Sequence, residues 1–322
     1  MRRSWTIALA TFVLVLAPVI AANSVAPPTQ SELVADAQAH LTAAQADLSA
    51  LAASLVTPTP SPTATAPTPT STSPTPSPTS TGGGGATWAP PTLTNPTTLT
   101  LTDGVTPSLG SGDYILKCPA NGVWVNAHGL EIKNAHNVIF DGPCFVDVGA
   151  GYVVSGGDPR ASRNGVVRRS AYILATTGNV YLRGLTFGSS AGDLTEGIDI
   201  STKSGTSTVT LQKLEFTAPL LGAYSSNHAD CLQSWTGPHS LLVDGLTCTT
   251  GYQGTFISPF DISGAPPVGA YILKNVTITG NAQAKYLLWA NGVSVSTTNV
   301  VVRYGLGPYP NLAAWPGVVW TR

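Results

Sequence analysis

The chain has 322 residues, of which only 10% are charged, and its formal net charge is −1 at pH 7. It is longer than a single domain of about 100–200 residues. Nucleic-acid binding depends on a basic surface that neutralises phosphates, so we expect no nucleic-acid partner for a chain of this charge.

The N-terminus has the composition of an export signal. Met1-Arg2-Arg3 precedes an apolar run from Trp5 to Ala22, and small residues follow it. We interpret residues 1–26 as a secretory signal peptide. The run is also nearly long enough to span a membrane, so an uncleaved N-terminal anchor is the alternative. Both interpretations place the protein outside the cell, as a secreted or cell-surface protein.

Two further segments precede the C-terminal part of the chain. Residues 29–56 are predicted to be helical, with Val34, Leu41, Leu48 and Leu55 spaced seven apart. This heptad pattern predicts a short coiled coil and homo-oligomerisation through residues 31–55, the alternative being a lone amphipathic helix. Residues 57–85 are rich in Pro, Thr and Ser and end in four glycines, which predicts an extended linker. Residues 86–322 form the remaining domain.

A two-part sequence repeat recurs through this domain, and we call its two segments the first and second half-phrases. Its first half is a polar residue, a small residue and an apolar one, as in Glu196-Gly197-Ile198 and Asp230-Cys231-Leu232. Its second half is a longer β-rich segment such as TVTLQKLEF, in which equivalent positions recur every 29 to 42 residues: Phe140, Leu182, Leu211, Val243 and Leu273. A period of about 20–50 residues is typical of a solenoid. With two or three short strands in each repeat, the pattern predicts an all-β domain, a parallel β-helix.

From Leu99 to Val302 the pattern resembles the right-handed parallel β-helix, or pectin-lyase-like, superfamily of secreted bacterial or phage-borne proteins. The resemblance implies a long, rigid outer face that suits a polysaccharide or cell-surface glycan better than a small molecule. The catalytic signatures of polygalacturonases are absent, and the calcium-binding aspartates of pectate lyases have no convincing counterpart. The resemblance therefore implies the fold and leaves the reaction open.

Alignment of the first half-phrases predicts which side chains share a face. Val166, Ile198, Leu232 and Phe260 form the predicted core ladder. Val167, Asp199, Gln233 and Asp261 form an outward column, and the next outward column contains Arg169, Ser201, Trp235 and Ser263. With strands about 4.8 Å apart, Asp199 and Asp261 would be about 9–10 Å apart, and Glu196 and Asp230 about 5 Å apart. Paired carboxyl groups at such distances are typical of inverting and retaining glycosidases, respectively.

These positions supply the candidate site residues. The candidate catalytic residues are Asp230, His228, Asp199, Asp261 and Glu196, because carboxyl and imidazole groups can exchange protons with a substrate. The candidate substrate-binding residues are Trp235, whose ring face can stack on a sugar, together with Gln233 and Arg169. In a lyase, His228, Arg169 or Lys203 would act on a uronate and its neighbouring proton. The alternative is that the polar ladder only faces solvent or caps turns.

The four cysteines fall in the predicted exported domain, where disulfides persist. The preferred bridge is Cys118–Cys144, joining an N-terminal cap to the first repeat. Strict alternation predicts that Cys231 faces outward and Cys248 inward, which argues against a bridge between them and leaves a buried free thiol at Cys248 as an alternative. No cysteine or histidine cluster has zinc-ligand spacing, so no cofactor is expected, although a bound Ca²⁺ stays open.

Two functions follow from these features. The first is an exported carbohydrate-active enzyme, a glycosidase or lyase, that acts on an extended polysaccharide. The second is a non-catalytic glycan-binding adhesin or a phage-type receptor-binding, tail-spike module. The missing enzyme signatures and the predicted oligomerising helix favour the second.

Overall fold

The computed structural model describes residues 87–154, 165–202, 206–222, 227–259, 269–281, 284–305, 307–309 and 312–321. All of these residues belong to one compact unit, Ser80–Arg322. The predicted signal or anchor, the heptad helix and the linker lie outside the described residues. Within the ranges given above, no helix is long and apolar enough to cross a membrane.

The described part of the chain is all-β, apart from one 3-10 turn. Two parallel sheets contain almost all of its strands, and a short antiparallel pair, β6 and β7, accounts for the others. The elements are β1 (Thr97–Thr100), β2 (Tyr114–Lys117), β3 (Val123–Val125), β4 (Leu130–Lys133), β5 (Val138–Asp147), β6 (Tyr152–Val153), β7 (Val166–Val167), β8 (Arg169–Leu174), β9 (Val180–Gly188), β10 (Glu196–Ser201), β11 (Thr208–Phe216), β12 (Asp230–Thr236), β13 (Ser240–Thr250), β14 (Gln253–Ile257), β15 (Tyr271–Gly280), β16 (Tyr286–Ala290), β17 (Val295–Arg303), β18 (Gly307–Tyr309), η1 (Leu312–Ala314) and β19 (Val318–Thr321).

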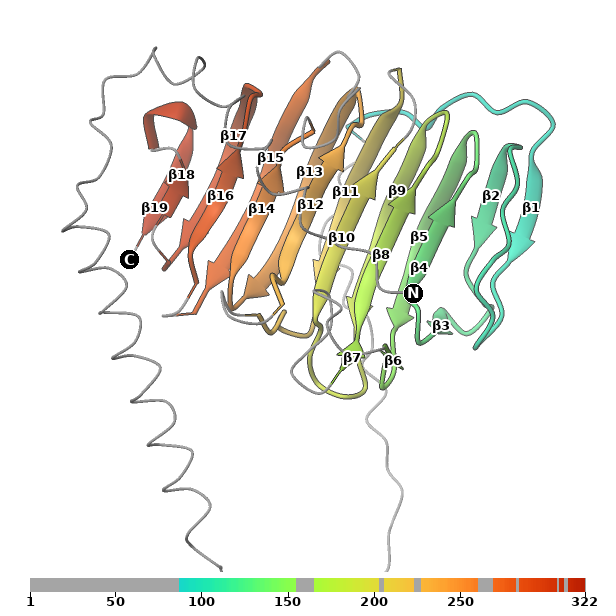
Figure 1. The fold of residues 1–322 in the computed structure, drawn as a ribbon. Helices are drawn as coiled ribbons and strands as arrows, with labels where there is room; N and C mark the ends of the chain where they lie inside the picture. Colours follow the sequence, from blue (N-terminus) through green and yellow to red (C-terminus); the bar gives the residue numbers. More distant parts are fainter. Residues whose placement is uncertain are drawn as a thin grey trace, which may run out of the picture. The chain divides into compact units, whose positions relative to one another are not determined.

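From β8 onward the chain alternates between the two sheets. Sheet A has the order β1-β2-β5-β9-β11-β13-β15-β17-β19, with β3 also paired to β5, and sheet B has the order β18-β16-β14-β12-β10-β8-β4. From β8 onward each strand therefore pairs with the strand two places later in the chain, and the strands follow one another through the stack in chain order (Figure 1). This all-β arrangement of parallel sheets is compatible with a parallel β-helix.

The second half-phrases of the repeat form sheet A in the predicted register. Leu182 is the partner of Phe140 and of Leu211 on its two sides, and Val243 is the partner of Leu211 and of Leu273. All five side chains are fully buried in one core cluster. Long β-branched and aromatic alternation in these segments specifies both the strand and its buried face, because a slip of one residue would expose every apolar side chain.

The first half-phrases form sheet B, but in a register that the sequence predicts only in part. Ile198 and Leu232 are partners, as expected. The partner of Ile198 on the preceding strand is Ala171, and that of Leu232 on the following strand is Thr255. The prediction that Val166 joins the core ladder is therefore wrong, since Val166 pairs in the antiparallel β6–β7 ribbon. Phe260 lies outside the described residues.

The reason for this error is the brevity of the first half-phrase. A pattern of only three residues, polar then small then apolar, is too short to identify one segment. Arg169-Ser170-Ala171 matches this pattern about as well as Asn164-Gly165-Val166 does. The segment in the sheet continues into Ile173, so it buries two apolar side chains against the core, Ala171 and Ile173. Burial against the neighbouring strands, rather than local pattern, decides between the candidates.

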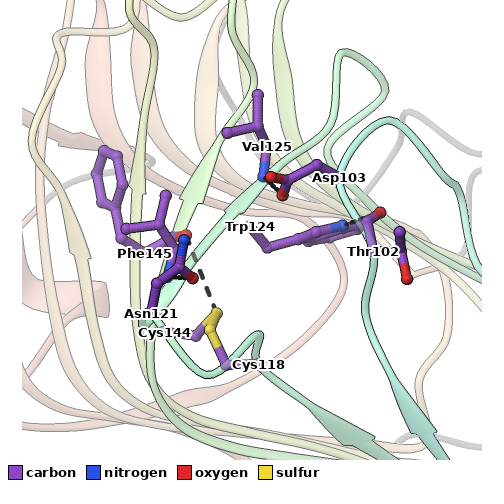
Figure 2. Close-up of a disulfide and its surroundings, with 9 residues drawn as sticks. Thr102, Asp103, Cys118, Asn121, Trp124, Val125, Cys144 and Phe145 are labelled. Atoms are coloured by element: carbon purple, nitrogen blue, oxygen red, sulfur yellow. Dashed lines mark hydrogen bonds between the residues drawn. A yellow bond between two sulfur atoms is a disulfide. The ribbon is translucent and has the colours of Figure 1, made fainter.

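The predicted disulfide Cys118–Cys144 is present and joins the residue after β2 to β5 (Figure 2). Beside it, the Trp124 indole is fully buried and its Nε1 donates to Thr102 O at 2.9 Å. The Val125 amide donates to the Asp103 carboxylate at 2.8 Å. The bridge and these bonds attach the first described strands to the rest of the stack.

A second disulfide joins Cys231 and Cys248, so the prediction that Cys231 faces outward, which argued against this bridge, is wrong. Cys231 and its neighbour Leu232 both have no exposed surface and belong to the same core cluster. Cys231 lies at the start of β12, and the register with β10 begins only at Leu232. Two disulfides indicate an extracellular or otherwise oxidising environment.

Candidate functional site

A column of outward side chains crosses the whole of sheet B. The register places them side by side on successive strands, and we call them the outer column: Glu131, Tyr172, Asp199, Gln233, Phe256, Trp289 and Tyr309. Its first four members are polar or phenolic, and its last three are aromatic. The outer face of sheet B therefore has a polar half and an aromatic half.

A second column runs beside the polar half. Arg169 pairs with Glu196 on the next strand, and Asp230 pairs with Gln253. The pairing of β10 with β12 begins at Ile198 and Leu232, two residues after Glu196 and Asp230. The charge of Asp230 raises the pKa of Glu196, so the two carboxyl groups lie near each other, as the sequence predicts.

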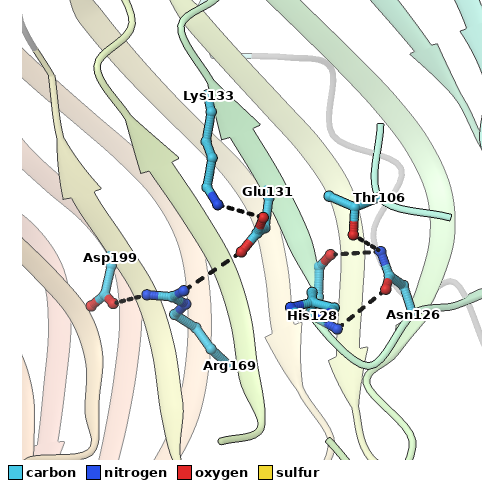
Figure 3. Close-up of polar contacts among 8 residues, drawn as sticks. Thr106, Asn126, His128, Glu131, Lys133, Arg169 and Asp199 are labelled. Atoms are coloured by element: carbon cyan, nitrogen blue, oxygen red, sulfur yellow. Dashed lines mark hydrogen bonds and ion pairs between the residues drawn. The ribbon is translucent and has the colours of Figure 1, made fainter. Parts of the chain in front are cut away.

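Arg169 lies between two acidic side chains, Glu131 and Asp199 (Figure 3). Its Nη1 is 3.0 Å from Asp199 Oδ2, and its Nη2 is 3.7 Å from Glu131 Oε1. The guanidinium carbon is 4.0 Å from the centre of the Tyr172 ring, which is the geometry of a cation–π contact. The arginine side chain is only 2% exposed, so these contacts replace water as the solvation of its charge.

Arg169 interacts with Glu131, Asp199 and Glu196, and Asp230 interacts with Asp199 and Glu196. We call these four acidic side chains the carboxyl cluster: Glu131, Glu196, Asp199 and Asp230. Glu131 also receives Lys133, whose Nζ lies 2.6 Å from Glu131 Oε2. The cluster thus contains two carboxylates with close cationic partners, Glu131 and Asp199. Glu196 and Asp230 have a different environment.

Burial raises the pKa of the Glu196 carboxyl well above its ordinary value, and the charges of Asp199 and Asp230 raise it further. Burial followed by the charge of Asp199 likewise raises the pKa of Asp230 well above its ordinary value. The physical cause is the same for both, because desolvation and a like charge each disfavour the ionised form. These two groups therefore retain protons at pH values where an ordinary carboxyl group has lost them.

Asp230 is held by one side chain of the outer column. Gln233 Nε2 donates to Asp230 Oδ2 at 2.9 Å. The other oxygen, Oδ1, is buried and has no hydrogen-bond partner among the residues that the structure describes. A carboxyl group that is held through one oxygen and has its pKa raised by burial is a candidate general acid.

The remaining predicted site residues are placed less favourably for chemistry. His228 is exposed, and its ring stacks on Tyr252 with the centroids 4.4 Å apart. Arg169 occupies the column of Glu196, not that of Ser201 and Trp235, so its predicted position is wrong. Gln233 has Phe256 as its neighbour on the following strand, which shows that the predicted register placing Asp261 there is wrong. Asp261 itself lies outside the described residues, as does Lys203.

Trp235 lies at an irregularity in β12. Ile200 pairs with Ser234, but Ser201 pairs with Thr236, so the tryptophan is skipped in the ladder. Such bulges redirect a side chain away from the regular face of a strand. The Trp235 side chain is 39% exposed, and its ring lies 5.1 Å from that of Phe256. The predicted surface tryptophan is therefore confirmed and lies beside the aromatic half of the outer column.

Five aromatic side chains form a continuous chain of ring contacts, which we call the aromatic strip: Trp235, Phe256, Tyr286, Trp289 and Tyr309. The ring centroids of Phe256 and Trp289 are 5.5 Å apart, and those of Trp289 and Tyr309 are 4.7 Å apart. Tyr286 contacts both Trp289 and Tyr309. The strip crosses four adjacent strands, from β12 to β18.

Sequence reasoning missed Glu131 and most of the aromatic strip. The available signal was the alternation within the short sheet B strands, in which GTFI, LLWA and GPY each place an aromatic residue at the outward position. Each of these strands has only three to five residues. Their relation becomes visible only when the correct register is known.

The first described residues lie against the opposite sheet. The Thr87 amide donates to Gln212 Oε1 at 2.6 Å, and Gln212 Nε2 donates to Trp88 O at 2.9 Å. The Lys274 ammonium lies 5.1 Å from the centre of the Trp88 ring. Thr87 and Trp88 therefore lie at sheet A, while the carboxyl cluster and the aromatic strip belong to sheet B.

Within the described ranges, no group of three or more His, Cys, Asp or Glu side chains is arranged to hold a metal ion. The arrangement offers proton donors in Glu196 and Asp230, a carboxylate held by Arg169, and a hydrophobic surface next to them. No family model, no curated protein and no solved structure matches this chain.

Proposed function

We propose that this chain is an exported carbohydrate-active protein of the right-handed parallel β-helix type, which cleaves an extended polysaccharide on the outer face of sheet B. The observation that carries the proposal is the carboxyl cluster. It combines two carboxyl groups that retain protons, Glu196 and Asp230, with a carboxylate paired to Arg169. Carboxyl groups whose environments separate their pKa values are suited to opposite roles as acid and base.

The proposed roles follow from the surroundings of each group. Asp230, held by Gln233 through one oxygen, donates a proton to the leaving glycosidic oxygen. Asp199, paired with Arg169, acts as the base or nucleophile. Glu196 lies beside Asp230 on the adjacent strand and holds a proton next to it. Trp235 and its aromatic neighbours support binding of a polymer at this site, since sugar rings present apolar faces on which aromatic rings can stack.

The alternative function is a non-catalytic glycan-binding adhesin or phage-type receptor-binding module. One observation favours it: Glu196 is 3% exposed and Asp230 is 1% exposed. Side chains buried to this degree also serve to organise a fold, in which case the outer face binds a glycan without cleaving it.

The deciding experiment incubates the full chain with neutral and uronate-containing polysaccharides and measures the products. New reducing ends indicate a hydrolase, and unsaturated products indicate a lyase. We expect Asp230→Asn to lower turnover by about 10²–10⁴-fold, the range for loss of a general acid or base, while the protein stays folded. The matched control is Asp244→Asn, which changes a carboxylate of sheet A.

Two results would contradict the catalytic proposal. One is normal turnover of a verified substrate by both Asp230→Asn and His228→Ala. The other is tight glycan binding by the unmodified chain without any product, which would establish the adhesin. If Asp230→Asn unfolds the protein, the role of this aspartate is structural, as a cap of the turn before β12, and not catalytic.

A further inference from the structure

We propose that the polysaccharide bound at this face is neutral, and that the aromatic strip binds its sugar rings next to the carboxyl cluster, so that the reaction is hydrolysis and not elimination. This inference rests on the proposed function, because it specifies the substrate class of the same site. Three observations carry it: the continuity of the two surfaces, the exposure of the strip, and the charge of sheet B.

The outer column joins the strip to the cluster. Gln233, which holds Asp230, is the direct partner of Phe256, and Phe256 is the partner of Trp289. The column ends at Tyr309 on β18. With adjacent strands about 4.8 Å apart, the strip extends for about 14 Å from β12 to β18. A polymer that follows the column would therefore contact aromatic rings and reach the carboxyl groups without changing direction.

The strip has accessible rings along its length. Trp235 and Tyr309 at its ends are 39% and 38% exposed. Phe256, Tyr286 and Trp289 between them are partly exposed. The rings brace one another, with Phe256 and Trp289 meeting edge to face. Rings held in this way lose little freedom on binding, which favours stacking on the apolar faces of sugars.

The charges on the strands of sheet B disfavour an anionic chain. These strands contain four carboxyl side chains, Glu131, Glu196, Asp199 and Asp230, and two cations. Both cations are committed to that cluster, Arg169 to Asp199 and Glu131, and Lys133 to Glu131. Glu196 and Asp230 retain protons, and Asp199 and Glu131 are balanced by these two cations, so the strands of sheet B have no cation left to pair with a uronate carboxylate. A carboxylate placed here would lose hydration without gaining a partner, which is unfavourable.

The same charge distribution selects the reaction. A lyase must neutralise a uronate before it removes the neighbouring proton, and the strands of sheet B have no uncommitted cation for this purpose. Hydrolysis needs only the groups already present. The glycosidic C–O bond breaks, the acid proton passes to the leaving oxygen, water supplies the hydroxyl group to the sugar carbon, and the second water proton passes to the carboxylate.

The test is affinity electrophoresis of the full chain in native gels that contain either a neutral polymer (mixed-linkage β-glucan, xylan, galactomannan or dextran) or an anionic one (polygalacturonate or alginate). We expect retardation by a neutral polymer and none by the anionic polymers at low salt. Trp235→Ala and Tyr309→Ala should each weaken binding about tenfold, as expected for loss of an aromatic anchor. The control is Tyr304→Ala, a 53% exposed tyrosine that follows β17 of sheet A.

The outcomes separate this inference from the proposed function. Neutral binding that is lost in the two strip variants, but kept in Tyr304→Ala, supports the inference even if no product forms. Preference for a uronate polymer, binding that the strip variants leave unchanged, or no retardation by any of the four neutral polymers overturns it. Self-association in sedimentation that disappears in Trp235→Ala also overturns it, because the strip would then be an interface between copies of the chain.

Discussion

Replacement of Arg169 by methionine tests whether this buried cation holds the carboxyl cluster together. The substitution keeps much of the side-chain volume and removes the charge. Arg169 is 2% exposed, lies 3.0 Å from Asp199 and stacks on Tyr172. Removal of one partner from a buried ion pair leaves the other charge uncompensated and costs about 3–5 kcal/mol. A domain has only about 5–15 kcal/mol of total stability, so the effect should be large.

The assay is urea unfolding at pH 8, followed by tryptophan fluorescence. The control is Arg183→Met, which breaks the partly exposed ion pair with Asp141. Ion pairs at the surface contribute only about 0–1 kcal/mol to stability. The double variant Arg169→Met/Asp199→Asn should recover part of the loss. An Arg169→Met variant that costs no more than Arg183→Met would refute the reasoning.

Three further predictions concern the same fold. First, the pKa values of Glu196 and Asp230 are raised, so the folded state holds protons that the unfolded state releases. The contribution of these two groups to stability is therefore greatest below their ordinary pKa values of 4.5 and 3.8, and it falls as the pH rises. Glu196→Gln/Asp230→Asn should flatten this decline in unfolding free energies measured from pH 4 to pH 8, and an unchanged slope would contradict it. Second, removal of the disulfide by Cys231→Ala/Cys248→Ala, which opens a loop closed over 17 residues, should cost about 3 kcal/mol in urea unfolding. Labelling of both native thiols by an alkylating reagent would show instead that the bridge is absent. Third, Gly197→Ala places a Cβ 2.3 Å from the Cys231 carbonyl oxygen on the next strand, so we expect a loss of about 1–3 kcal/mol. A Gly197→Ala variant with the same melting temperature as the unmodified chain would argue against this close approach.

Sheet A was largely predictable, because each of its long strands has a clear apolar alternation of its own. β9, β11, β13 and β15 have nine to eleven residues each, and their alternation is long enough to specify both the strand and its register. The match of Phe140, Leu182, Leu211, Val243 and Leu273 confirms this. The periodicity of these apolar side chains survives in the sequence because each one fills the same place in the core.

Sheet B was predictable only where two repeats resemble each other closely. The alignment of β10 with β12 gave the partners Ile198 and Leu232, and Asp199 and Gln233, as expected. The same reasoning failed at β8 and β14, where it placed Arg169 beside the wrong residue and Asp261 in the place of Phe256. Strands of five or six residues allow several registers that bury similar amounts of apolar surface, and the neighbouring strands choose among them.

The sequence by itself therefore determined the all-β class, the parallel stacking of sheet A and the bridge between Cys118 and Cys144, since each depends on repeated or local patterns. Only the tertiary structure decided that Cys231 turns inward to Cys248, that Arg169 lies between Asp199 and Glu131, and that the aromatic strip is continuous. These features join residues from different repeats across short strands. Their positions depend on how the repeats stack, and stacking is a property of the packed molecule that no single repeat encodes.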